Sequence, residues 1–177
     1  MRVFTLLLLS FLFLSHCGLV EDALPDVTFN VTADQLRFEL PATAEPANIE
    51  STLDDVPSEI IAELNREDID TDRIKSVKIE ALELELLSVA EEFSFTDLND
   101  LTVTVVAPGL RPTTLAAGAL RDVNGNLATL DVADTDLAEQ LLAERASYTV
   151  SLRTSRAVPE GVVLGVTPVF AVVARPL

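Results

Sequence analysis

Hydrophobic and polar residues alternate along most of the chain, which is the pattern of half-buried β-strands. Residues 27–32 show it clearly, with Val27, Phe29 and Val31 on one face and polar residues on the other. The pattern therefore predicts a mainly β protein. Similar alternating or β-branched runs, each expected to form a strand, occupy residues 36–40, 93–96, 101–106, 113–120, 127–132, 147–154 and 162–174.

The longest predicted strand covers residues 74–89. Its hydrophobic positions are odd-numbered up to Ile79 and even-numbered from Leu82 onward. One extra residue in a strand exchanges its two faces, so we expect a β-bulge at Ala81-Leu82. Ala, Leu and Glu also favour helices, but the two-residue alternation favours a strand here.

Several turn and loop signals separate these strands. Residues 41–55 are loop-like, with two prolines and the pair Asp54-Asp55. Asn124-Gly125 is the strongest hairpin signal, because both residue types accept a positive φ. Pro168 interrupts the last strand, and a proline in a strand is expected at a sheet edge or at a bulge.

Two short helices are predicted. The first begins at Pro57, which suits a first helical turn, and runs to about Arg66, with Glu59 near the positive end of the helix dipole. The second covers residues 134–144, with Asp134 able to cap it.

The number and spacing of these elements predict the fold class. About eight short strands with turn signals between them, plus two short helices, indicate an antiparallel β-sandwich of immunoglobulin-like character. The chain has one Cys and no Trp, so it lacks the Cys…Trp…Cys pattern of true immunoglobulin domains. The comparison is therefore one of architecture only.

The first 16 residues read as an export signal. Arg2 precedes an apolar run from Val3 to Leu14. That run has the length of a signal-peptide core and is well short of the roughly 20 residues that a spanning helix needs.

The end of this segment, Leu14-Ser15-His16-Cys17-Gly18, resembles the lipobox of bacterial lipoproteins. Leu14, Ser15, Cys17 and Gly18 fit that pattern, and His16 occupies the position where the family has a small residue. In that family the cysteine receives a diacylglyceryl group and becomes the mature N-terminus. The resemblance covers the leader alone and implies lipidation at Cys17.

The resulting domain prediction has three parts: a signal peptide at 1–16, a lipidated tether at 17–26 and the β-sandwich at 27–177. We expect an exported protein that is anchored to a membrane in the periplasm or at the cell surface. The alternative is an ordinary secretory signal, with Cys17 incidental and the protein secreted. Both alternatives place the domain outside the cytosol.

Charge narrows the possible partners. The chain has 12 Lys and Arg against 29 Asp and Glu, a formal charge of -17. This excess of acid argues against nucleic-acid binding, which requires a basic surface. Lys is scarce beside Arg, and an acidic surface with little Lys is typical of proteins that work in concentrated salt.

The residue types exclude several chemistries. Without the leader the chain has no His and, apart from Cys17, no Cys. Catalytic triads that use His, and zinc, haem or iron–sulfur sites that use Cys or His, are therefore excluded. Carboxylates remain plentiful, but no acid–base pair stands out by its context. We predict that the protein is not an enzyme, and no small-molecule substrate is indicated.

Calcium is the one cofactor that the sequence leaves open. Asp68, Asp70 and Asp72 offer carboxylates at alternate positions, and Ca²⁺ prefers oxygen ligands. The segment does not match an EF-hand, because Arg73 and Ile79 stand where Gly and Glu are required. A looser calcium site remains an alternative to a solvated acidic loop.

Two functional hypotheses follow. The first is a lipid-anchored, non-enzymatic β-sandwich that acts as a structural or interaction module of the cell envelope, with an envelope protein as its partner. The second is a secreted or tethered calcium-dependent adhesion or binding module.

Overall fold

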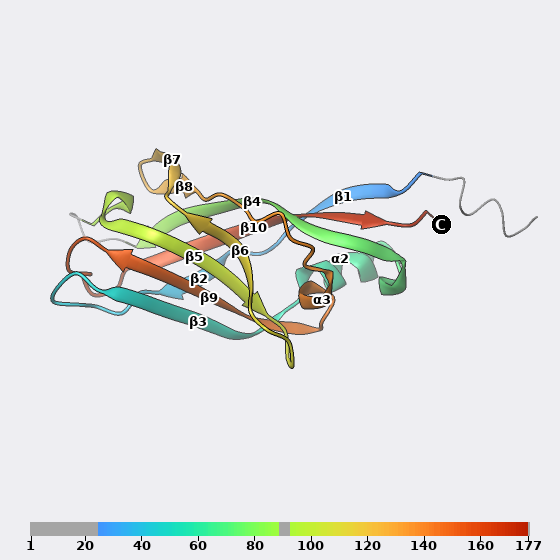
Figure 1. Ribbon diagram of the computed structural model, residues 1–177, viewed down its shortest axis with the longest axis horizontal. Coiled ribbons are helices and arrows are strands. Elements are labelled where there is room, and N and C mark those ends of the chain that lie inside the picture. Colours follow the sequence, from blue (N-terminus) through green and yellow to red (C-terminus); the bar gives the residue numbers. More distant parts are fainter. Residues whose placement is uncertain (1–24, 89–92, 177) are drawn as a thin grey trace, which may run out of the picture.

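A computed structural model describes residues 25–88 and 93–176 and confirms a mainly β protein in which two antiparallel sheets pack face to face (Figure 1). The first sheet has the order β1-β10-β4-β8-β7, and β2 pairs with β10 on the side of β1. Its strands are β1 (Val27–Thr32), β2 (Leu36–Glu39), β4 (Ile74–Ser88), β7 (Arg121–Asn124), β8 (Leu127–Thr129) and β10 (Val163–Ala174).

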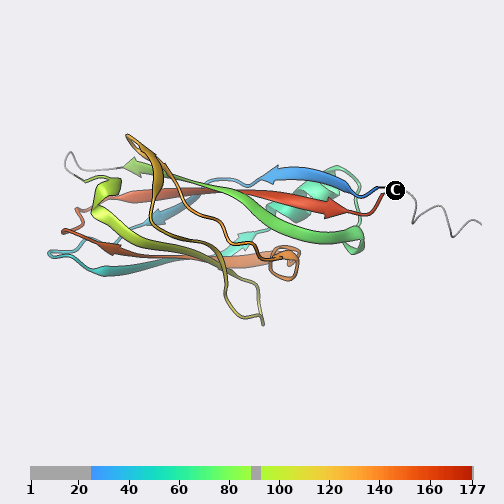
Figure 2. The same cartoon turned by 45° about the horizontal axis from the view of Figure 1, so that its top comes forward.

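The second sheet has the order β3-β9-β5-β6. Figure 2 shows the two sheets as separate layers, with both helices at one end of the molecule. The strands are β3 (Asn48–Pro57), β5 (Leu98–Val106), β6 (Thr113–Gly118) and β9 (Arg145–Thr154). The helices are α2 (Glu59–Arg66) and α3 (Ala138–Leu141), with the 3₁₀ turns η2 (Thr71–Arg73) and η3 (Phe95–Asp97).

One core fills the space between the sheets. Phe38 and Phe170 from the first sheet and Leu115 from the second are among its fully buried side chains. Side chains from the inner faces of both sheets are buried against each other. This burial of apolar surface is the main contribution to the stability of the fold.

The chain also joins the two sheets along one side. After β8, Leu130 still donates its N–H to Leu82 of β4 at 3.4 Å. Two residues later Val132 bridges Ala116 of β6, and Ala133 N donates to the Leu115 carbonyl at 2.8 Å. A single continuous segment therefore passes from the edge of one sheet to the edge of the other.

The predicted irregularity in the long strand is confirmed, one residue from its expected place. Val169 pairs with Ala81, but the next residue, Phe170, pairs with Ile79, so Glu80 is the extra residue of β4. Buried positions change parity across it, from Ile79 to Leu82. The bulge therefore lets both halves of β4 face the core.

The sheet edge predicted for Pro168 is wrong, because β10 lies between other strands, but the alternative, a bulge, is close by, since the register with β4 shifts between Val169 and Phe170. β10 pairs with β4 on one side, and with β2 and then β1 on the other. Pro168 lies between the segments paired with β2 and β1, and its carbonyl accepts a bond from Ala33 N at 3.0 Å. The backbone N and carbonyl of one residue point to the same side of a strand. The N–H that proline lacks would therefore point into the gap between β2 and β1, where no ladder bond is lost.

The loop predicted at 41–55 is also wrong in its second half, where β3 pairs with β9. β3 is an edge strand with polar residues on its outer face, and Ile49 is its only fully buried hydrophobic residue. The ladder is interrupted at Asp54-Asp55, where Asp55 has a φ of 61°. A weak alternation and an interrupting acidic pair are the reasons that the sequence pattern resembled a loop.

Residues 93–100 differ from the prediction in type. The expected strand at 93–96 is replaced by η3, and β5 begins at Leu98, three residues before the strand expected at 101–106. Ser94 and Asp97 form a capping box, in which Ser94 N donates to Asp97 Oδ2 at 2.9 Å. This local bonding outweighs the strand propensity of Phe93 and Phe95, whose side chains are nevertheless buried.

The predicted hairpin forms, shifted by one residue. Asn124 pairs with Leu127, so the two turn residues are Gly125 and Asn126. Only Gly125 of these has a positive φ, 62°.

The first helix is confirmed, and the second is much shorter than predicted. Ser58 caps α2, with Ser58 Oγ accepting a hydrogen bond from Ile61 N at 3.3 Å. α3 covers Ala138–Leu141 rather than 134–144. Asp134 does not cap it but pairs with Lys78 at 2.6 Å, because the segment before α3 lies against β4.

Candidate functional site

The predicted anchor, Cys17, lies outside the described residues, as does the leader. The chain enters the fold at the start of β1, at the same end of the molecule as the C-terminus (Figure 1). Val27 pairs there with Ala174, and Asp26 forms an ion pair with Lys75 at 2.7 Å. Within the described ranges no helix is long and apolar enough to cross a membrane.

The three predicted calcium ligands lie in the connection between α2 and β4. Asp68 follows the end of α2 with a φ of 56°, and Ile69 N donates to the Leu64 carbonyl at 2.9 Å. This is a Schellman motif, in which the left-handed position closes a helix. Asp70 precedes η2, and Asp72 lies in its first turn. Each of the three aspartates therefore lies in, or directly next to, a turn of the backbone.

The structure brings no metal-binding group together in the part of the chain that it describes. No set of three Asp, Glu, His or Cys side chains there is arranged to hold a metal ion. The calcium alternative accordingly stays a prediction.

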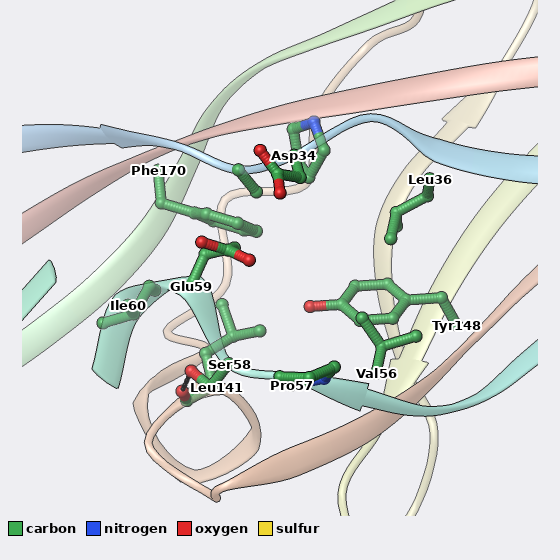
Figure 3. A pocket seen from close by; sticks show the side chains of 12 residues that line it. Asp34, Leu36, Val56, Pro57, Ser58, Glu59, Ile60, Leu141, Tyr148 and Phe170 are labelled. Carbon is green, nitrogen blue, oxygen red and sulfur yellow. Dashed lines mark hydrogen bonds between the residues drawn. The ribbon is translucent and has the colours of Figure 1, made fainter. Parts of the chain in front are cut away.

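A pocket lies between the two sheets next to α2 (Figure 3). Its cavity volume is about 30 Å³, which is room for one or two waters or a very small group. Most of its wall is apolar: Leu36, Val56, Ile60, Leu141 and Phe170 line it. The polar groups around it are Asp34, Ser58, Glu59 and Tyr148.

Tyr148 of β9 presents its hydroxyl to this pocket. The side chain is 6% exposed, and Figure 3 shows its oxygen directed toward the middle of the cavity. No described residue forms a hydrogen bond with that hydroxyl. Burial raises the pKa of Tyr148 to about 12, with a further contribution from the negative charge of Glu59.

Glu59 and Asp34 bring two carboxylates to the same place. Glu59 is the first residue of α2, and Asp34 lies in the connection between β1 and β2. Figure 3 shows Glu59 beside the Phe170 ring and Asp34 above it. Among the described residues neither carboxylate has a hydrogen bond or an ion pair.

The Ser58 hydroxyl, in contrast, forms hydrogen bonds both as a donor and as an acceptor. Its hydroxyl donates to the Leu141 carbonyl at 2.5 Å and accepts the capping bond from Ile61 N. Ser58 thus ties α2 to α3 and fixes the floor of the pocket.

This group of residues was not predicted from the sequence, where Glu59 stood out only as a residue near the positive end of the helix dipole. A signal was nevertheless present: Tyr148 shares its strand parity with Val150 and Leu152, both buried. A phenol at a core position needs a polar partner, so this position could have been marked in advance.

Comparison with known proteins assigns no family. No protein-family model matches the chain, and no curated protein matches it. Among solved structures, one match is a chain from a structure of infectious bursal disease virus Gx strain, with 15% sequence identity and a TM-score of 0.32. The match covers 85% of this chain and 32% of the viral chain, so this chain spans about a third of its length.

Proposed function

We propose that this protein is an exported, non-enzymatic β-sandwich, held to a membrane by a lipid on Cys17, that serves as an interaction module of the cell envelope. The observation that carries the proposal is the place where the chain enters the fold. β1 starts ten residues after Cys17, at one end of the long axis of the molecule (Figure 1).

In an anchored molecule, this placement would turn one end of the sandwich toward the membrane. The nine residues between Cys17 and Val27 can span about 30 Å at most when fully extended. A lipid on Cys17 would hold the end with the chain termini and η2 toward the bilayer. The connections β2–β3 and β9–β10 lie at the opposite end and would face outward, where an envelope partner would contact them.

The chemistry of the chain supports a role in interaction rather than turnover. A mature chain that begins at Cys17 has no imidazole and no thiol other than the lipidated one. The Tyr148 hydroxyl is a poor general base, because its raised pKa keeps it protonated at neutral pH.

The test is expression in a bacterial host with the natural leader, followed by mass measurement and detergent partitioning. We expect a lipid-sized mass increase on the N-terminal peptide and recovery in the detergent phase. Both should be lost in Cys17→Ala. A His16→Gly variant restores the small residue of the lipobox and controls for poor processing. A soluble, unmodified product from both the natural sequence and His16→Gly would contradict the anchor.

A further inference from the structure

We propose that the pocket between α2 and β9 binds a primary ammonium group on a short alkyl chain, the group carried by small free amines and by lysine side chains. The proposal concerns the folded domain alone and does not depend on the anchor at Cys17. It rests on a hydroxyl that faces the cavity without a partner among the described residues, on two unpaired carboxylates, on two aromatic rings and on the size of the cavity.

The Tyr148 hydroxyl is the first reason. The residue is 6% exposed, but its hydroxyl oxygen is open to the cavity, since no fully buried side-chain oxygen of the described residues lacks a partner. The hydroxyl has no hydrogen bond to a described residue, and it points into the cavity (Figure 3). An occupant that can donate a hydrogen bond to the phenol oxygen, or accept one from it, would satisfy this group.

The surrounding charge selects the kind of occupant. Asp34 and Glu59 both line the pocket, and the described part of the chain offers neither of them a cationic partner. Two carboxylates repel an anion and favour a cation. The overall charge of -17 also concentrates cations near the surface.

The walls favour an organic cation over a bare metal ion. The rings of Phe170 and Tyr148 line the pocket, and aromatic faces attract ammonium groups. Leu36 and Val56 offer apolar surface to methylene groups. A hard metal ion would need more oxygen ligands than this lining provides.

The volume limits the size of the cation. About 30 Å³ admits an ammonium nitrogen with one or two carbons, and it is too small for a bulky quaternary ammonium. A longer alkyl chain would have to leave through the mouth. A lysine side chain of a partner protein has this shape.

The chain provides its own probe for the test. Tyr148 is the only tyrosine and there is no tryptophan, so tyrosine fluorescence reports on this pocket alone. The purified protein would be titrated with ethylammonium chloride at constant ionic strength. We expect a saturable change with a Kd in the millimolar range, because so small a ligand buries little surface. Sodium, tetramethylammonium and ethanol should produce no saturable change.

Matched variants test whether ethylammonium binds in this pocket. Glu59→Gln and Asp34→Asn should each weaken binding roughly tenfold, as the loss of one charge-assisted contact would do. Glu67→Gln removes the same charge from an exposed position at the other end of α2 and should leave the Kd unchanged. Tyr148→Phe has no tyrosine fluorescence, so its binding of ethylammonium would be measured by thermal shift. We expect this variant to lose the binding.

A second titration separates the two sources of the group. A blocked lysine amide that binds as well as ethylammonium would indicate a lysine of a partner protein, and much weaker binding would indicate a free amine. The proposal is overturned if tyrosine fluorescence responds equally to sodium, or if Glu59→Gln and Glu67→Gln behave alike. A crystal structure that shows only water in the pocket in the presence of ethylammonium would overturn it as well.

Discussion

The carboxylate of Asp136 takes the place of a neighbouring strand beside Val77. Asp136 Oδ1 accepts hydrogen bonds from Val77 N and from Ala138 N, both at 3.0 Å, while Leu137 N donates to the Val77 carbonyl at 2.7 Å. Val77 is fully buried in β4, and the neighbouring strand β8 pairs only with residues 83–85. The Asp136 carboxylate therefore accepts the otherwise free N–H of Val77 at this edge of β4 and also that of Ala138, the first residue of α3.

Asp136→Ala should lower the free energy of unfolding by about 2 kcal/mol, since it leaves the buried Val77 N–H without a partner and removes the acceptor of Ala138 N. Urea denaturation measures the loss. Asp136→Asn keeps an acceptor oxygen and should lose less. Asp134→Ala is the matched control, because its ion pair with Lys78 is exposed and should contribute little. Equal losses for the Asp134 and Asp136 alanine variants would contradict this role.

The Gln140 side chain holds the β5–β6 connection in place through hydrogen bonds. Its buried side chain accepts a bond from Ala107 N at 2.7 Å and donates to the Arg111 carbonyl at 2.8 Å and to Thr113 Oγ1 at 3.1 Å. Gln140→Ala should therefore cost about 2–3 kcal/mol of unfolding free energy. Glu139→Ala, at the exposed neighbouring position, serves as the control. A loss no larger than that of the control would show that water replaces these bonds.

These two residues illustrate what the sequence could and could not predict. Strand positions followed from period-two alternation, and even the bulge in β4 was visible as a change of parity near Ile79. Asp136 and Gln140 were invisible, because their partners are backbone groups 59 and 33 residues away in the chain. No local pattern encodes such a contact.

The candidate pocket failed to appear in the sequence for a related reason. It is assembled from Asp34, Glu59, Tyr148 and Phe170, which come from one connection, one helix and two strands. Only the packing of the two sheets brings them together. The pairing of β10 with both β1 and β2, which the edge position expected for Pro168 did not allow for, places Asp34 and Phe170 on the same side of the pocket (Figure 3).

Stability at high pH should report the burial of Tyr148. Its pKa is raised from 10.0 to about 12, so the folded state holds the phenol proton more tightly than the unfolded state. The resulting contribution to stability, roughly 2–3 kcal/mol, is present in full below pH 10 and is lost as the pH rises toward 12. Tyrosinate absorbance against pH measures the titration directly. Tyr148→Phe should flatten the decline in unfolding free energy over this range; an unchanged decline would assign it to other groups.

The left-handed backbone at Asp68 predicts a stabilising substitution. Glycine is the residue best suited to the position that closes a Schellman motif, so Asp68→Gly should raise the unfolding free energy by about 0.5–1 kcal/mol. Asp70 has an ordinary φ of -68°, and Asp70→Gly should lower it by a similar amount. Thermal unfolding of the two variants provides the comparison. Destabilisation by both would mean that the Asp68 side chain has a role beyond the turn.

Calcium binding would supply such a role, and it can be separated from a general effect of salt. The three aspartates at 68, 70 and 72 take up turn positions and join no metal-binding group in the described residues. If these aspartates form a solvated acidic loop, CaCl₂ should raise the Tm no more than NaCl of the same ionic strength, through screening of the many carboxylates. A calcium-specific rise that disappears in Asp70→Asn would contradict this and favour the calcium-dependent module. A rise with any salt would identify the acidic surface itself as the cause.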